Sequence, residues 1–128
     1  MLQKVENYQN ALKRLEEAIA RYQTTPSDTL YRDGLIQRFE FTVELAWKSI
    51  KEYLEDQGST TPIATPRAVL KEAFAAGVIQ DAEEWNKIIT ARNITSHVYD
   101  EKTAEDVAAQ ICNDFLPLLK ALGKFYRD

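Results

Sequence analysis

The chain has 128 residues with a formal net charge of −4, and 45% of them are hydrophobic and 28% charged, which is the composition of an ordinary globular domain. This balance excludes a disordered polyelectrolyte and disfavours nucleic-acid binding over the whole surface, because proteins that neutralise phosphates are normally basic. The single cysteine, Cys112, excludes a disulfide framework and a cysteine-based zinc site. Without a signal segment or an 18-residue apolar run, we expect one cytoplasmic domain over residues 1–128, with no membrane span.

The first half of the sequence predicts two long helices. Apolar residues recur at helical spacing over residues 2–23, and the segment 24–27 breaks that pattern. A second helix is expected over residues 28–57, with Gly58 as its C-terminal stop. Gly34 lies inside the second helix, where it weakens the helix by about 1 kcal/mol relative to alanine. A glycine there could also allow a close approach of another helix.

Two shorter helices follow the loop that begins at Gly58. Thr65 is a good N-cap and Pro66 a good first helical residue, so a short third helix is expected to end near Gly77. Asp81, with Glu84 three residues later, predicts the start of a fourth helix.

A fifth helix completes the predicted fold. We expect Thr103 to cap it, and we expect Pro117 to remove a backbone hydrogen bond and kink it. No segment shows the alternation of a strand. The sequence therefore predicts an all-α fold, an up-and-down antiparallel four-helix bundle with one additional short helix.

The candidate functional site is the segment Arg92-Asn93-Ile94-Thr95-Ser96-His97-Val98-Tyr99. Its histidine, His97, is the only one in the chain and can move a proton near neutral pH. Arg92 can bind a phosphate through its planar fork and stabilise the charge that builds during phosphoryl transfer. Asn93 lies four residues before His97, about 40° away around a helix, and could orient the imidazole. These residue types suit RNA cleavage without a metal ion.

The spacing of the pair leaves other interpretations open. Arg92 and His97 lie about 140° apart on an ideal helix, so one helix does not aim both at a small target. A two-fold dimer that faces two such helices would ease this geometry. On spacing alone, a lone histidine near a helix end is more often a surface or capping residue, and a helical arginine is more often an exposed ion-pair partner.

No other motif in the sequence indicates a different chemistry. Asp100, Glu101, Glu105 and Asp106 could bind a cation, but acidic residues at a helix start usually serve the helix dipole. Zinc-protease, phosphate-loop, dinucleotide-binding and nucleophile-elbow motifs are lacking. We therefore expect no metal ion and no cofactor.

The site motif and several blocks resemble one known family. Arg92 to His97 matches the Arg-polar-x(3–5)-His signature of HEPN domains, and Val98-Tyr99 extends it to the R-x4-H-x-Y form. That form occurs in HEPN proteins paired with a minimal nucleotidyltransferase. The block from Arg38 to Lys48 is similar to the second helix of the subgroup called nucleotidyltransferase substrate-binding proteins. Thr65-Pro66-Arg67 and Glu84-Trp85 also resemble that subgroup.

The resemblance implies a HEPN bundle that forms a homodimer, with both Arg92–His97 pairs at a shared cleft. Many HEPN proteins are toxins that cleave RNA without a metal ion, using the histidine for acid–base catalysis and the arginine on the phosphate. The implied partner is a minimal nucleotidyltransferase, which joins the toxin in a hetero-oligomer and silences it as the antitoxin. The transferase would do so by moving AMP onto the motif tyrosine, here Tyr99.

Two functions thus remain open at the level of sequence. The first is an endoribonuclease toxin controlled by its partner. The second, implied by the subgroup's name, is a non-catalytic subunit that binds substrate for a two-component nucleotidyltransferase. The intact motif from Arg92 to His97 favours the nuclease, whereas the acidic net charge favours the binding subunit, because free RNA would be repelled at long range.

Overall fold

The computed structural model describes residues 2–95 and 100–128, and within these ranges the chain is helical and contains no strand. The helices in chain order are α1 (Gln3–Thr24), α2 (Thr29–Asp56), α3 (Pro66–Ala75), α4 (Ala82–Thr95), α5 (Glu101–Gln110), the π-helical turn η1 (Ile111–Phe115) and α6 (Leu116–Arg127). The predicted all-α bundle is confirmed. The helices α1, α2 and α4 and the run α5–η1–α6 form the bundle, and α3 is the additional short helix.

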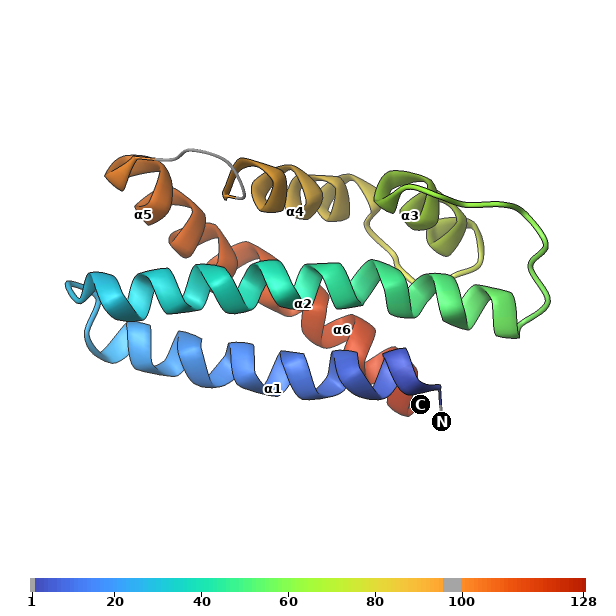
Figure 1. Ribbon diagram of the computed structural model, residues 1–128, viewed down its shortest axis with the longest axis horizontal. Coiled ribbons are helices and arrows are strands. Elements are labelled where there is room, and N and C mark those ends of the chain that lie inside the picture. The colour runs from blue at the N-terminus through green and yellow to red at the C-terminus, as the bar shows by residue number, and fades with distance from the viewer. Residues whose placement is uncertain (1, 96–99) are drawn as a thin grey trace.

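The helix α2 lies at the centre of the arrangement. It runs antiparallel to α1 along nearly its whole length, and α3 and α4 lie on its other side (Figure 1). The run from α5 to α6 crosses behind α2 and reaches α1 with its C-terminal part (Figure 1). Every long element therefore buries its apolar stripe against one shared core.

Side-chain caps and left-handed glycines set the ends of the helices. Asp28 caps α2 by accepting hydrogen bonds from the backbone N–H groups of the second and third residues that follow it. Thr65 caps α3 in the same way, and Asp81 accepts the N–H of Glu84 at 3.0 Å, as predicted. Gly58 and Gly77 follow α2 and α3 with φ values of 98° and 76°, a conformation that favours glycine.

The prediction that Thr103 caps the fifth helix is wrong. Asp100 is the N-cap of α5, and its Oδ1 accepts the N–H of Thr103 at 2.8 Å. Thr103 thus lies in the first turn of the helix rather than before it. An aspartate is at least as good an N-cap as a threonine, and here the aspartate comes first along the chain.

The sequence did not indicate the π-helical turn that precedes Pro117, and the kink expected at this proline stays a prediction. Pro117 does not break a regular α-helix; instead the preceding turn is π-helical, and the N–H of Leu116 bonds to the carbonyl of Ile111, five residues earlier. A proline ring clashes with the carbonyl four residues before it, here that of Asn113. The wider turn at Asn113 accommodates the proline without ending the helical run.

One close contact between helices involves a glycine, but it is not Gly34. A Cβ atom at Gly34 would have no other atom within 4 Å, so that residue does not serve close packing. At Gly123 on α6 a Cβ atom would lie 2.9 Å from Leu12 and 3.0 Å from Gln9, both on α1. Next to this contact, the buried Tyr8 hydroxyl donates to the carbonyl of Leu119 at 2.6 Å. These contacts fix the separation of α1 and α6.

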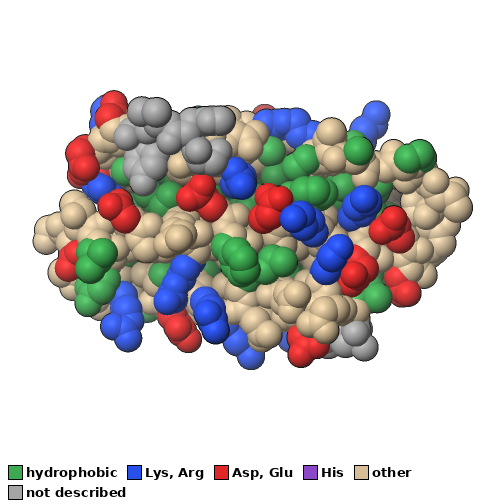
Figure 2. Space-filling view, in the orientation of Figure 1, with side chains coloured by type: hydrophobic (Ala, Val, Ile, Leu, Met, Phe, Trp, Pro, Cys, Tyr) green, Lys and Arg blue, Asp and Glu red, His purple; other side chains and the backbone are tan. Residues whose placement is uncertain are grey.

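The surface is mostly charged and polar, with a few exposed apolar groups. Figure 2 shows acidic and basic side chains interspersed on one face, around a central group of hydrophobic ones. Within residues 2–95 and 100–128, the exposed large hydrophobic side chains are Leu30, Phe41, Phe74 and Ile94. Among the described residues, no helix is both long enough and apolar enough to cross a membrane.

Candidate functional site

Arg92 lies in the last turn of α4, a helix held in place by its buried face. Trp85, Ile88 and Ile89 are among the residues that α4 buries in the core. In the last turn, the hydroxyl of the buried Thr95 donates to the carbonyl of Arg92 at 3.0 Å. The backbone that carries Arg92 is therefore fixed, and the side chain keeps 29% of its surface exposed. The guanidinium thus combines a rigid base with access from solvent.

The charge of Arg92 is balanced by a carboxylate on the central helix. Its Nε lies 3.6 Å from Oε2 of Glu44, which is an ion pair but too long for a good hydrogen bond. The same Nε is buried and lacks a hydrogen-bond partner within residues 2–95 and 100–128. The terminal nitrogens of Arg92 donate no hydrogen bond to the described part of the chain, so the fork that would bind a phosphate is not occupied by it.

Glu44 is the residue of the site that the sequence did not single out. The spacing of Glu40, Glu44 and Lys48 predicts an exposed ion-pair ladder, and the Glu44–Lys48 pair is present at 3.4 Å. What the spacing cannot show is that Glu44 also faces Arg92 on a different helix. Glu44 therefore links two cations and orients the one that carries the motif.

The other motif residues are described only in part. Asn93 is exposed on α4. His97 and Tyr99 lie outside the described residues, so the proposed alignment of Asn93 with His97, and the position of Tyr99 at the site, stay predictions.

The residues that directly follow the motif, Asp100 and Glu101, are anchored by a helix cap and a second ion pair. Asp100 caps α5, and Glu101 accepts hydrogen bonds from the side chain of the buried Arg32 on α2, the shorter at 2.6 Å. The hydrogen bond and charge of Arg32 hold the pKa of the Glu101 carboxyl below its usual range. Backbone donation from Thr103 lowers the pKa of the Asp100 carboxyl as well.

Both ends of the motif are thus tied to α2 by an arginine–carboxylate pair. Arg92 is held through Glu44, and Glu101 through Arg32, two positions of α2 about 18 Å apart along the helix axis. Arg32 also pairs with Asp33 at 3.0 Å, which completes the neutralisation of a buried cation. Thr95 and Asp100 therefore both lie at fixed points of the bundle.

The remaining candidates from the sequence have structural roles. The described residues contain no group of three or more histidine, cysteine or carboxylate side chains placed to hold a metal ion, and Glu101 is already engaged by Arg32. Trp85 belongs to the core. Cys112 is half-buried, and this burial raises the pKa of its thiol and makes it less reactive.

The helical bundle and the motif at the end of α4 together define a class of protein. Residues 3–127 match the family described as nucleotidyltransferase substrate binding protein like. The chain belongs to this family, and the resemblance to the nucleotidyltransferase substrate-binding subgroup of HEPN proteins is confirmed.

Several known proteins are similar to the chain. A curated relative from Haemophilus influenzae, named probable ribonuclease HepT, is 44% identical over 92 residues. These residues make up 70% of this chain but only 62% of that relative, so the match spans less than two thirds of the relative's length. A solved structure from Haemophilus influenzae, described as the fold of a substrate-binding domain of a nucleotidyltransferase, is 31% identical with a TM-score of 0.85. It aligns over 97% of this chain and 99% of its own.

A second solved structure, a crystal structure of a protein from Thermus thermophilus, gives a TM-score of 0.77 at 28% identity. It covers 92% of this chain and 98% of its own. The same helical arrangement thus recurs in proteins whose sequences differ at most positions.

Proposed function

We propose that this chain is a metal-independent endoribonuclease of the HEPN toxin type, controlled by a minimal nucleotidyltransferase. The observation that carries the proposal is the placement of Arg92. Its guanidinium is paired with Glu44 in the last turn of α4, with its terminal nitrogens not bonded to the described residues, five residues before the only histidine of the chain. The name of the 44% identical relative, a probable ribonuclease, supports the same activity.

The proposed reaction follows from the two side chains. His97 takes the proton of a ribose 2′-OH as that oxygen attacks the adjacent phosphorus. The bond from phosphorus to the 5′-oxygen breaks, and the leaving oxygen receives a proton from the imidazolium of His97. Arg92 donates two hydrogen bonds to the non-bridging oxygens and stabilises their growing charge. The products are a 2′,3′-cyclic phosphate and a free 5′-OH, and no metal ion enters the reaction.

The nuclease is tested with the chain expressed and purified alone. We expect growth arrest on expression, and RNA cleavage that survives EDTA and leaves 2′,3′-cyclic phosphate ends. His97→Ala should lower the rate on the order of 10² to 10⁴-fold, the usual contribution of a general acid–base group. Arg92→Ala should also abolish arrest, with Arg21→Ala as the matched control, since Arg21 is an exposed arginine on α1. Activity lost with EDTA, or retained in His97→Ala, would exclude the mechanism.

The proposed control acts on Tyr99. Transfer of AMP from ATP to the phenol oxygen releases pyrophosphate and adds a phosphodiester charge that can pair with Arg92 and block RNA. Incubation with the partner transferase, ATP and Mg²⁺ should give an AMP adduct on Tyr99 by mass spectrometry and a loss of RNA cleavage. Tyr99→Phe should remain unmodified and active. Equal inhibition of Tyr99→Phe would mean that the partner inhibits by binding alone.

The second candidate function is a non-catalytic subunit that binds substrate for the transferase. The family description and the description of the 31% identical structure favour it. Under this function the purified chain would leave RNA intact, while the transferase would act on its own substrate only when this chain is present. The same set of Arg92 and His97 variants therefore separates the two functions.

A further inference from the structure

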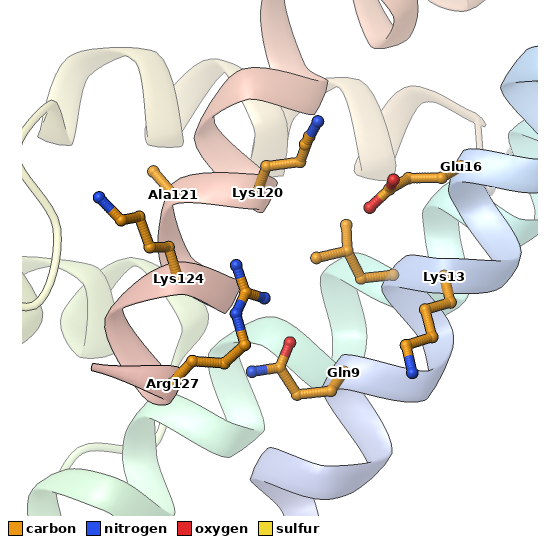
Figure 3. A pocket seen from close by; sticks show the side chains of 8 residues that line it. Gln9, Lys13, Glu16, Lys120, Ala121, Lys124 and Arg127 are labelled. Atoms are coloured by element: carbon orange, nitrogen blue, oxygen red, sulfur yellow. The ribbon is translucent and has the colours of Figure 1, made fainter.

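A basic groove lies between α1 and α6, two helices that carry none of the motif residues. It has a volume of about 470 Å³, and its charged lining residues are Lys13 and Glu16 on α1 and Lys120, Lys124 and Arg127 on α6 (Figure 3). We call this the α1–α6 groove. Figure 3 shows Lys13 on the wall opposite the α6 cations, with the guanidinium of Arg127 turned toward the middle of the groove.

The charge of the groove is opposite to that of the chain. Four cations and one carboxylate give it a net charge of +3 in a chain of net charge −4, which leaves −7 on the rest. Within residues 2–95 and 100–128, none of the four cations has a carboxylate within 4 Å. Exposed cations elsewhere are of both kinds, since Lys87 and Lys102 are paired with a carboxylate of their own helix and Lys4 and Lys71 have none within 4 Å among the described residues. The groove differs in that it gathers four such unpaired cations in one place.

The fold arranges these cations in a row. Lys120, Lys124 and Arg127 are spaced by four and three residues, so they share one face of α6 over about 10 Å. Gly123 lies within the row and allows α1 to approach, and the side-chain amide of Gln9 donates to its carbonyl at 2.9 Å. The floor of the groove is therefore rigid, while the cationic side chains around it are unpaired among the described residues.

We infer that the α1–α6 groove binds the phosphate backbone of single-stranded RNA. A row of about 10 Å spans roughly three phosphates, at about 3.4 Å per phosphate along a stacked strand. The lining contains no aromatic side chain on which a base could stack, so the contact is to phosphates and independent of sequence.

The same lining argues against a protein ligand. The centres of protein interfaces are enriched in aromatic residues and depleted of lysine, whereas three of the four cations here are lysines and the apolar lining is limited to Leu12 and Ala121.

The inference rests on the proposed nuclease, because RNA is the substrate of that function. It also answers the objection raised by the acidic net charge, since the cations needed to hold RNA are gathered in one place.

The test measures binding separately from cleavage. The probe is a fluorescent 2′-O-methyl RNA oligonucleotide, which lacks the free 2′-OH that cleavage needs, and anisotropy is recorded from 50 to 200 mM salt. The double variant Lys120→Gln/Lys124→Gln should weaken binding at 50 mM salt on the order of tenfold or more. It should also reduce the slope of log K against log salt by about 1.4, the value for two lost phosphate contacts on a single strand.

The matched control is Lys4→Gln/Lys71→Gln, which removes the same charge from two exposed lysines on α1 and α3 outside the groove. This control should bind the probe with the same affinity and the same salt dependence as the unmodified chain. Equal affinity and slope in both double variants would overturn the inference. So would a groove variant that keeps its RNA affinity but loses its complex with the transferase, which would make the groove a protein interface.

Failure of the proposed nuclease would give a different result. His97→Ala should bind the probe as the unmodified chain does, because the groove lies on other helices. If the unmodified chain does not cleave RNA but the groove double variant still binds the probe more weakly than the control does, the groove inference holds and the nuclease is wrong. If cleavage is normal and the groove variants bind as the control does, the nuclease holds and the groove inference is wrong.

Discussion

At the scale of single residues, the most informative contact is the one between Glu44 and Arg92. If Arg92 binds phosphate as proposed, a carboxylate beside it costs some attraction for RNA, yet the ion pair holds the guanidinium in one direction. If orientation matters more than net charge, the contact should raise the turnover rate rather than the affinity for RNA.

The variant Glu44→Gln tests this balance. We expect kcat for RNA cleavage to fall about tenfold while KM does not rise, since removing a negative charge favours RNA binding. The control is Glu40→Gln, one turn earlier on α2, which makes no ion pair with any described residue. Equal kcat values for the two variants would show that Glu44 does not position Arg92.

The pair between Arg32 and Glu101 predicts a pH dependence of stability. The pKa of the Glu101 carboxyl is lowered in the fold, so the unfolded chain binds more protons in the acid range. Its contribution to the free energy of unfolding is present above the unfolded pKa of about 4.3 and is lost as the pH falls through the folded pKa. Glu101→Gln should be less stable than the unmodified chain at pH 7.

The difference between these two proteins should shrink between about pH 5 and pH 3, measured by urea unfolding at each pH. The lowered pKa of Asp100 acts in the same direction, but it is present in both proteins and cancels in the comparison. A difference that stays constant over this range would show that the charge of Glu101 does not stabilise the fold.

Part of the site could be predicted from the sequence and part could not. The candidates Arg92, Asn93 and His97 can be named from their residue types and from the resemblance of the motif, because both are read locally along the chain, and their role in catalysis stays a prediction. Glu44 and Arg32 could not be found in this way, because their partners lie 48 and 69 residues further along the chain. The pairing exists only after α2 has been packed against α4 and α5.

At the scale of elements, α1 and α6 are held together by the close contact at Gly123. Gly123→Ala places a Cβ atom 2.9 Å from the buried Leu12 and disturbs the hydrogen bond from Gln9. Overpacking of this kind costs about 1–3 kcal/mol, partly offset by about 1 kcal/mol of better helix propensity. We expect a net loss of stability of about 1 kcal/mol.

Gly34→Ala is the matched comparison. Gly34 also lies inside a helix, but a Cβ atom there meets nothing within 4 Å. We expect this variant to gain about 1 kcal/mol from helix propensity alone. Thermal or urea unfolding of both variants measures the contrast, and similar changes in both would mean that the approach of α6 to α1 does not depend on glycine.

The element boundaries were largely predictable because caps are local. Thr65 and Asp81 act as caps as the sequence indicates, and Gly58 follows the end of α2. The error at Thr103 arises because Asp100 is also a suitable cap and comes first along the chain, so that Glu101 is the first residue of α5 and pairs with Arg32 on α2.

At the scale of the whole molecule, the predicted homodimer would place its interface at the surface that carries the motif. Ile94 lies between Asn93 and Thr95 and keeps 44% of its surface exposed, which is unusual for a large apolar side chain next to a charged site. If two copies meet at a shared cleft, the chain should sediment at about twice 14.7 kDa.

Ile94→Glu should then raise the dissociation constant of the dimer at least tenfold, because a buried unpaired charge opposes association. Phe74→Glu, at an exposed phenylalanine on α3, is the control and should leave the dimer intact. A chain that is monomeric at micromolar concentration, or equal sedimentation of the two variants, would contradict a shared cleft.

The π-helical turn from Ile111 to Phe115 also bears on how this chain can change in length. A π-helical hydrogen bond closes over one more residue than an α-helical one, so the turn holds one residue in excess of a regular helix. Loss of the exposed Asn113 would convert the turn to α-helix and leave the buried faces of α5 and α6 in register, at the cost of bringing the Pro117 ring against the carbonyl of Cys112. The same loss in the middle of α2 would rotate half of that helix by about 100° and turn its core residues toward solvent. A one-residue deletion therefore keeps the core in register in the last helical run and destroys that register in the central helix.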